Sequence, residues 1–483
     1  MAKKSVAQNY TYNLIYQFLT VILPLVTTPY LSRILGATNI GIFGYTFSII
    51  TYFILFGSMG VAMYGQREIA YVQNDKKKQS QIFWEIIIIR FISYIIVLSL
   101  FYILFCIKNQ YSIYYKILLI EMLANSIDIT WYFQGMEDFK KPVIRNLIVK
   151  VMGLILIFAL VKKESDLWLY FLIYTLSDFL GNATLWLYIK NYITLKIDKL
   201  NLKKHIKPIM VLFLPQIAIQ IYAVLDKTMV GLITSDMKEV GYYDQAQKIV
   251  RALLLFVTSL GAVMNSRIAN TYAKNNKAEL KNYVKQSINM VWLVATPCIF
   301  GLLCISSVFV PWYFGKGYDP VINLINVTSV VLIAIGLNNV TGVQYLIQVK
   351  KQNIFTLSVV IGAISNVIGN FIFINMFGTV GAVYSSIIAE FIILFIQLYY
   401  TRDIIKIRDI LITSINYIIS SIVMFIAVKL LMNFLPQTII FTIINVIGGV
   451  IVYVVMLLLL HDKLFINILN QTIQFIKNRL KGK

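Results

Sequence analysis

Long apolar runs separated by short polar breaks dominate this chain. A helix that crosses a bilayer needs about 20 mostly apolar residues, and fourteen segments meet that requirement. The predicted spanning helices cover residues 10–33, 40–63, 81–107, 112–135, 143–162, 167–190, 208–234, 244–268, 286–311, 321–347, 354–374, 381–399, 410–432 and 438–460. The pattern therefore predicts an all-α polytopic membrane protein of about fourteen transmembrane helices.

The chain repeats itself once, at a spacing of about 200 residues. Corresponding positions in the two copies are Gly41 and Gly241, Gly60 and Gly261, and Arg67 and Arg267. Both copies run in the same direction, which predicts two parallel six-helix repeats plus two extra C-terminal helices. Many transporters built from parallel repeats place their substrate site between the two lobes, so the repeat favours transport by alternating access over catalysis.

The repeat and the polar breaks also predict how the chain divides. We expect an N-lobe over residues 1–190, a cytoplasmic linker over 191–207, a C-lobe over 208–400, and helices 13 and 14 within 401–460. The last segment, 461–483, has apolar residues near helical spacing among basic ones. This pattern predicts an amphipathic cytoplasmic tail at the membrane surface, with an unordered basic tail as the alternative.

The charge distribution explains a net charge of +22 without a nucleic-acid partner. With the N-terminus inside, the cytoplasmic segments hold 30 Lys and Arg residues and the outer loops hold 7. Such an excess is typical of topology anchors under the positive-inside rule. It predicts a multi-pass protein with both termini in the cytoplasm. The mean hydropathy of +0.76 and the 59% hydrophobic content agree with lipid as the solvent.

Metal and enzyme chemistry have little support in the sequence. Cys106, Cys298 and Cys304 all lie in apolar runs, without the spacing of a metal site or a disulfide framework. His205 and His461 are far apart in predicted cytoplasmic loops, so neither a zinc site nor a catalytic set is expected. We therefore expect no catalytic residues, no metal and no cofactor, and we expect that the protein is not an enzyme.

Ionisable residues inside spanning helices mark a substrate or ion pathway by default. The cations that we predict to bind a substrate diphosphate are Arg251, Arg90, Lys248, Lys227 and Lys150. Lys248 and Arg251 are three residues apart and share a helix face, and arginine and lysine both suit phosphate oxygens. The alternative is that these two cations are solvated near a membrane surface.

Several acids lie among these cations. The candidates for ion coupling, or for charge partners of the cations, are Asp226, Asp128, Glu121 and Glu390. A buried carboxylate can take up a proton or a sodium ion, so transport could couple to either gradient or to the membrane potential. The structural alternative is that these acids neutralise Arg90 or Lys150, which also lie within spanning segments.

Three motifs resemble the polysaccharide-transporter branch of the multidrug/oligosaccharidyl-lipid/polysaccharide exporter superfamily. They are Pro29-Tyr-Leu-Ser-Arg-Ile-Leu-Gly36, Trp131-Tyr-Phe-Gln-Gly-Met-Glu137, and Leu225-Asp-Lys227. The resemblance implies a bacterial flippase that moves undecaprenyl-diphosphate-linked oligosaccharide units from the inner to the outer leaflet, for O-antigen or capsule synthesis. It implies two six-helix lobes around a central cavity, with Arg251 as the best candidate for the diphosphate. A polysaccharide polymerase is the expected protein partner.

Two other functions are weighed against this one. A multidrug antiporter of the same superfamily would favour acidic over basic cavity residues, whereas the buried set here is mixed. A membrane polysaccharide polymerase or glycosyltransferase would need a sizeable outer loop, but the predicted outer loops have roughly ten residues or fewer. The sequence therefore favours the lipid-linked oligosaccharide flippase in the bacterial cytoplasmic membrane.

Overall fold

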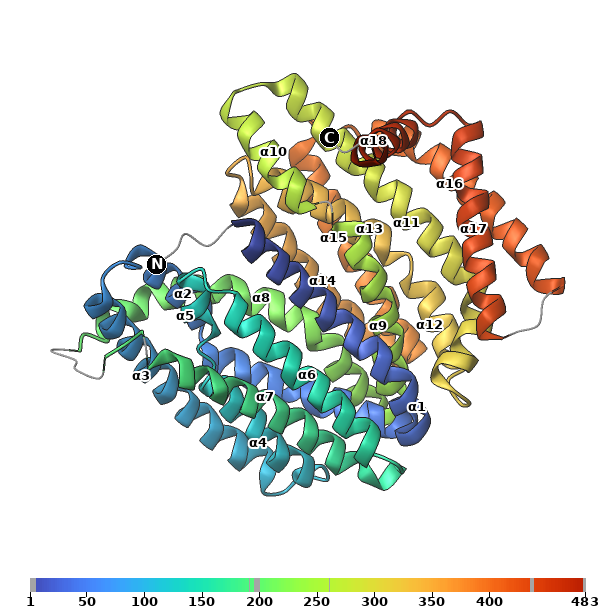
Figure 1. The fold of residues 1–483 in the computed structure, drawn as a ribbon. Helices are drawn as coiled ribbons and strands as arrows, with labels where there is room; N and C mark the ends of the chain where they lie inside the picture. Colours follow the sequence, from blue (N-terminus) through green and yellow to red (C-terminus); the bar gives the residue numbers. More distant parts are fainter. Residues whose placement is uncertain (1–5, 191, 195–199, 260, 435–437, 481–483) are drawn as a thin grey trace. The chain divides into compact units, whose positions relative to one another are not determined.

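A computed structural model describes residues 6–190, 192–194, 200–259, 261–434 and 438–480 (Figure 1). Within these residues, all the regular elements are helices. Residues 191 and 195–199 of the predicted linker, and 481–483 of the predicted tail, lie outside the described part. The predicted all-α membrane architecture is confirmed.

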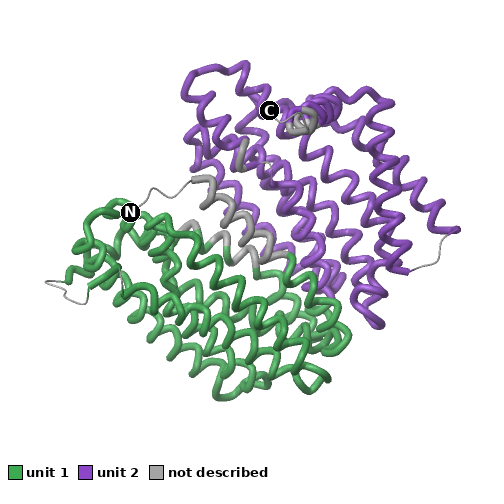
Figure 2. The backbone as a smooth tube through the Cα atoms, viewed as in Figure 1, with its two compact units in different colours: residues 1–241 green, residues 242–483 purple. Residues whose placement is uncertain are grey.

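The chain forms two compact units, residues 1–241 and 242–483 (Figure 2). The first contains α1 (Val6–Ser58), α2 (Val61–Tyr71), α3 (Lys76–Phe101), η1 (Tyr102–Cys106), α4 (Ser112–Ser126), α5 (Thr130–Gly135), α6 (Lys140–Leu160), η2 (Glu164–Asp166), α7 (Leu167–Ile189) and α8 (Lys203–Thr234). Helix α9 (Met237–Thr258) begins in the first unit and continues into the second.

The second unit holds the remaining helices. They are α10 (Gly261–Ala273), α11 (Lys277–Phe314), α12 (Pro320–Thr328), α13 (Val331–Asn338), η3 (Asn339–Leu346), α14 (Gln352–Phe377), α15 (Thr379–Thr401), α16 (Ile407–Phe434), α17 (Ile439–Leu459) and α18 (Lys463–Leu480). The units divide at residue 241, one helix later than the predicted linker, because α8 packs against α1 and α2. The predicted tail segment carries helix α18.

The fourteen predicted spans map in order onto these helices. Helix α1 contains the first two, because Gly36 breaks it with φ 72° and ψ 170°. Glycine adopts a positive φ at little cost, so it suits the turn between two spans. Four other predicted spans are built from consecutive pieces, namely α3 with η1, α4 with α5, α9 with α10, and α12 with α13 and η3. Nine helical segments of the described chain are long and apolar enough to cross a membrane by themselves.

The outward face of the second unit is apolar and its interior is partly polar, as α14 illustrates. Asn366 and Asn370 are fully buried, whereas Ile368 is 56% exposed and Phe371 is 67% exposed. In water this arrangement would be inverted. Asn366 O accepts a hydrogen bond from Ser385 Oγ of α15 at 2.8 Å. Helix α14 therefore packs by polar and small residues and presents its hydrocarbon side chains to lipid.

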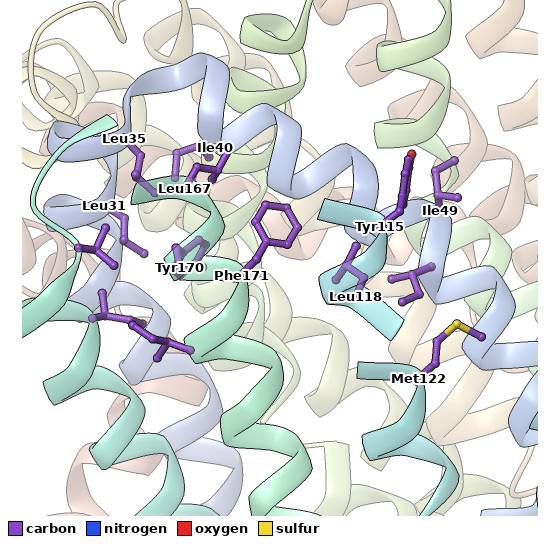
Figure 3. Packing of buried hydrophobic residues seen from close by; sticks show 14 of the residues in the cluster. Leu31, Leu35, Ile40, Ile49, Tyr115, Leu118, Met122, Leu167, Tyr170 and Phe171 are labelled. Carbon is purple, nitrogen blue, oxygen red and sulfur yellow. The ribbon is translucent and has the colours of Figure 1, made fainter. Parts of the chain in front are cut away.

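The core of the first unit is aromatic and aliphatic (Figure 3). Leu31 and Leu35 of α1 pack with Leu167 and Phe171 of α7. At the centre, the ring of Phe43 lies 4.9 Å from that of Phe171 in an edge-on arrangement. Rings with this geometry add attraction beyond the area that they bury, so the core holds α1 firmly against α7.

Helices α1 and α9 cross in backbone contact at the two glycines that open the sequence repeats. A Cβ built on Gly41 would lie 1.6 Å from Met237 O, and one built on Gly241 would lie 2.2 Å from Ala37 O. Each distance is far below any van der Waals contact, so both positions require glycine. The crossing joins equivalent positions of the two repeats within the first unit.

Candidate functional site

The fourth span is broken between α4 and α5, and side chains from two other helices bind backbone carbonyls beside the break. Arg90 of α3 and Asn182 and Trp186 of α7 are the donors. The bonds are Arg90 Nη2 to Asn125 O at 2.5 Å, Asn182 Nδ2 to Ala124 O at 2.8 Å, and Trp186 Nε1 to Ile127 O at 2.7 Å. Unsatisfied carbonyls are costly in hydrocarbon, so these donors stabilise the break.

Arg90 is the most deeply buried of the predicted diphosphate ligands, with 3% of its surface exposed. Its guanidinium also lies over the ring of Tyr94, at 5.8 Å from the centroid. Nε and Nη1 have no hydrogen-bond partner among the described residues. Glu121 is close to the same carbonyl, because its Oε1 accepts a bond from Asn125 Nδ2 at 3.0 Å. Arg90 and Glu121 therefore belong to one buried polar network.

Arg145 is a member of this network that sequence reasoning missed. It lies near the start of α6, which begins with two lysines, and it is only 9% exposed. Its Nη1 donates to Asn182 Oδ1 at 2.8 Å and its Nη2 donates to Thr130 Oγ1 at 3.3 Å. The available signal was its position five residues before Lys150 on the same helix.

Asp128 lies in the break itself. Its Oδ1 accepts a hydrogen bond from the backbone N–H of Thr130 at 2.9 Å, and Thr130 is the first residue of α5. An aspartate in this place satisfies one of the free N–H groups at a helix start. The contact accounts for the residue structurally, and its role in ion coupling stays a prediction.

Lys150 and Asp178 form an ion pair between α6 and α7. The Nζ to Oδ1 distance is 2.7 Å, and the side chains are 38% and 24% exposed. Lys150 also lies 5.2 Å from the ring centroid of Tyr174. The structure thus pairs Lys150 with Asp178, an acid that was not among the partners proposed for it from the sequence.

Asp226 and Lys227 lie half-buried in α8, next to a residue that ties this helix to α1. The hydroxyl of Thr228 is 2.8 Å from Ser48 Oγ and 3.0 Å from Tyr52 Oη. These three hydroxyls form a buried link between the two helices. They fix the part of α8 that carries the adjacent predicted site residues.

In the second unit, α9 carries the remaining predicted cations. Lys248 Nζ contacts Asp244 Oδ2 at 2.7 Å, one turn away on the same helix, and Asp244 is nearly fully buried. Arg251, one turn further along, is exposed. The amide of Gln245 is fully buried, and no described residue satisfies its nitrogen or its oxygen. Lys248 is thus partly neutralised by Asp244.

Glu390 of α15 is buried beside a π-helical turn in the tenth span. Asn338 Nδ2 donates to Glu390 Oε2 at 2.7 Å and to the Glu390 carbonyl at 3.0 Å. Nearby, Thr341 Oγ1 donates to Gln397 Oε1 at 2.5 Å. The π-helix η3 starts directly after Asn338, and π-helical turns are frequent at functional sites. The amides in this apolar segment were the signal that the sequence reading overlooked.

A further buried cluster joins α2, α3 and the start of α8. We name Glu85, Tyr64, Lys204 and His205 the Glu85 cluster. Glu85 is fully buried, and its Oε2 lies 2.8 Å from both His205 Nε2 and Lys204 Nζ. On the other side of the ring, His205 Nδ1 lies 2.7 Å from Tyr64 Oη. The prediction that His205 lies in a loop is therefore wrong, because tertiary packing buries it to 2% exposure.

No three His, Cys, Asp or Glu side chains of the described chain are placed to hold a metal ion. The predicted site residues fall into separate groups. Arg90, Glu121 and Asp128 surround the break in the fourth span, Lys150 pairs with Asp178, and Glu390 lies in the second unit. What these groups share is a set of charged side chains within helices that face lipid, a position in which charged residues often mark a functional site.

Comparison with solved structures shows the same fold. A lipid II flippase MurJ in an inward closed conformation matches with a TM-score of 0.74 and 17% identity, over 94% of this chain and 99% of that chain. An inward-facing MATE family multidrug resistance transporter of the MOP superfamily matches with a TM-score of 0.64 and 14% identity, over 80% and 95%. The chain thus has the same fold as these two proteins.

Sequence comparison identifies the family. The family described as "Polysaccharide biosynthesis protein" matches residues 6–265, and the chain belongs to it. The "Putative O-antigen transporter" of Escherichia coli (strain K12) is 24% identical over 409 residues, which cover 83% of this chain and 98% of that protein. The chain is therefore a polysaccharide-type transporter and not an enzyme, which confirms the resemblance seen in its motifs.

Proposed function

We propose that this protein flips undecaprenyl-diphosphate-linked oligosaccharide units from the inner to the outer leaflet of a bacterial cytoplasmic membrane, by alternating access. The observation that carries the proposal is its likeness to an O-antigen transporter over nearly the whole length of both proteins. Both termini lie in the cytoplasm in this proposal, since 30 Lys and Arg residues lie in the segments on that side. The products feed a polysaccharide polymerase, which is the proposed protein partner.

The diphosphate is the part of such a substrate that most needs protein contacts. Arg251 is the foremost proposed ligand, since it is exposed and its guanidinium can bind two phosphate oxygens at once. Lys248 lies one turn away and adds a second positive charge, which Asp244 offsets in the absence of substrate. An inside-negative potential helps to expel the anionic headgroup, by about 2.3 kcal/mol per charge per 100 mV.

A headgroup-exposure assay in proteoliposomes tests this proposal. We expect wild-type protein to expose the headgroup of a diphosphate-linked oligosaccharide lipid, and Arg251→Ala to lower the rate by roughly tenfold, about what the loss of one charged hydrogen bond costs. Lys429→Ala, an equally exposed cation on α16, is the matched control. No exposure by wild type across several sugar lipids would instead favour the multidrug antiporter.

Ion coupling is tested separately. We propose that Glu121 or Glu390 takes up the coupling ion, since both are buried and each has an amide group as partner. Glu121→Gln or Glu390→Gln should then abolish the dependence of the exposure rate on a proton or sodium gradient, while uncoupled exchange persists. A wild-type rate that is the same at all pH values and sodium concentrations would remove this part of the proposal.

A further inference from the structure

A small groove lined by charged and apolar side chains lies in the second unit, between the first turns of α11 and α16. Lys281 and Lys285 of α11 line it, together with Asp409 of α16. Ile404 and Ile405, from the turn that precedes α16, belong to its apolar lining. None of these residues belongs to the groups of charges considered for the substrate or the coupling ion.

The two lysines act together. They are four residues apart on α11, so their side chains leave the same face of the helix. Both are exposed, whereas Asp409 is half-buried. Taken with Asp409, the lining of the groove carries a net charge of +1, because two cations face one carboxylate. That charge complements a phosphodiester, which carries a single negative charge, better than a diphosphate.

The depth of the groove matches the level of lipid headgroups. Helix α11 has 38 residues and is thus about 57 Å long, nearly twice the hydrocarbon thickness of about 30 Å. Lys281 and Lys285 lie within its first nine residues, so they stand outside the hydrocarbon. Ile288 and Ile410 also line the groove and give an acyl chain an apolar path toward the bilayer.

We propose that this groove binds the headgroup of an anionic phospholipid of the phosphatidylglycerol kind. The phosphate lies between Lys281 and Lys285, and an acyl chain follows the isoleucines. Lysine binds phosphate as a point charge, and each lysine near a membrane surface contributes roughly fivefold to the binding of an anionic lipid. The bound lipid bridges α11 and α16, so it stabilises the contact between these helices. This inference does not depend on the proposed substrate.

Native mass spectrometry of the purified full-length protein tests the inference. We expect the protein to bind one phosphatidylglycerol in preference to phosphatidylcholine. The double variant Lys281→Gln/Lys285→Gln should weaken that binding about 25-fold. The control Lys316→Gln/Lys429→Gln removes the same charge far from the groove, since Lys316 follows the C-terminal end of α11 and Lys429 lies in the last turns of α16, and it should leave the binding unchanged.

A third variant makes the test independent of folding losses. Asp409→Asn raises the net charge of the groove from +1 to +2 and should strengthen phosphatidylglycerol binding about fivefold. Equal effects of the two lysine double variants would mean that surface charge alone attracts the lipid, and would overturn the proposal. A lack of preference over phosphatidylcholine would do the same. If a polyprenyl diphosphate binds here more tightly than phosphatidylglycerol, the groove belongs to the substrate instead.

Discussion

Gly41→Ala is expected to leave little folded protein. The added Cβ would lie 1.6 Å from the carbonyl oxygen of Met237, and a backbone oxygen in a helix cannot move aside as a side chain can. The two backbones would therefore have to move apart at this contact. Overpacking usually costs 1–3 kcal/mol, and a backbone clash should cost about 3 kcal/mol or more. Gly241→Ala is expected to have the same effect, because its Cβ would lie 2.2 Å from Ala37 O.

The measurements are the yield of monodisperse protein after extraction and its melting midpoint, read with a thiol-reactive dye. Such a dye suits this chain because Cys106 and Cys304 are buried until the protein unfolds. Gly301→Ala is the matched control, since no atom lies within 4 Å of a Cβ built there, and alanine favours the helix by about 1 kcal/mol. A Gly41→Ala protein with the yield and melting midpoint of wild type would refute the backbone contact.

Glu85→Gln is expected to be the most destabilising charge-neutralising substitution in the first unit. The carboxylate is fully buried and is contacted by four groups, which are the side chains of Lys204, His205 and Gln81 and the backbone N–H of Asn201. An amide keeps the shape but removes the charge that these donors require. Breaking one side of a buried ionic cluster costs about 3–5 kcal/mol, which lowers the melting midpoint by roughly 6–15 °C.

Two graded controls separate this effect from a general sensitivity of the region. Tyr64→Phe removes only the hydrogen bond to His205 and should cost about 1 kcal/mol. Glu68→Gln breaks a bridge to Arg67 whose side chains are 44% and 23% exposed, so it should cost less than 1 kcal/mol. If all three variants melt at the same temperature, the Glu85 cluster has no special role in holding the start of α8.

The helices were predictable because their signal is local. A bilayer of fixed thickness demands runs of about 20 apolar residues, and each of the fourteen runs became a helix or a chain of short helices. The turn at Gly36 also follows from local chemistry, since glycine accepts its positive φ. The matched positions that predict two parallel repeats are likewise visible in the sequence itself.

The partners of the buried charges could not be predicted in the same way. Arg145 follows two lysines at the start of a helix and resembles a topology anchor, and only the packing of α7 shows that it binds Asn182. His205 lies in a lysine-rich stretch before Pro208, which looks like a loop until α2 and α3 cover it. Their burial depends on residues more than thirty positions away. The predicted diphosphate ligands remain a prediction for the same reason.

The contact between Gly41 and Gly241 limits which substitutions each half of the chain can accept. Each copy supplies the surface against which the other copy's glycine is pressed. A larger residue at either position would therefore clash with the backbone of the other half, whichever residues surround it in its own half. Charges and loops elsewhere can differ between the two halves. At this crossing, the backbone of each half restricts the facing position of the other half to glycine.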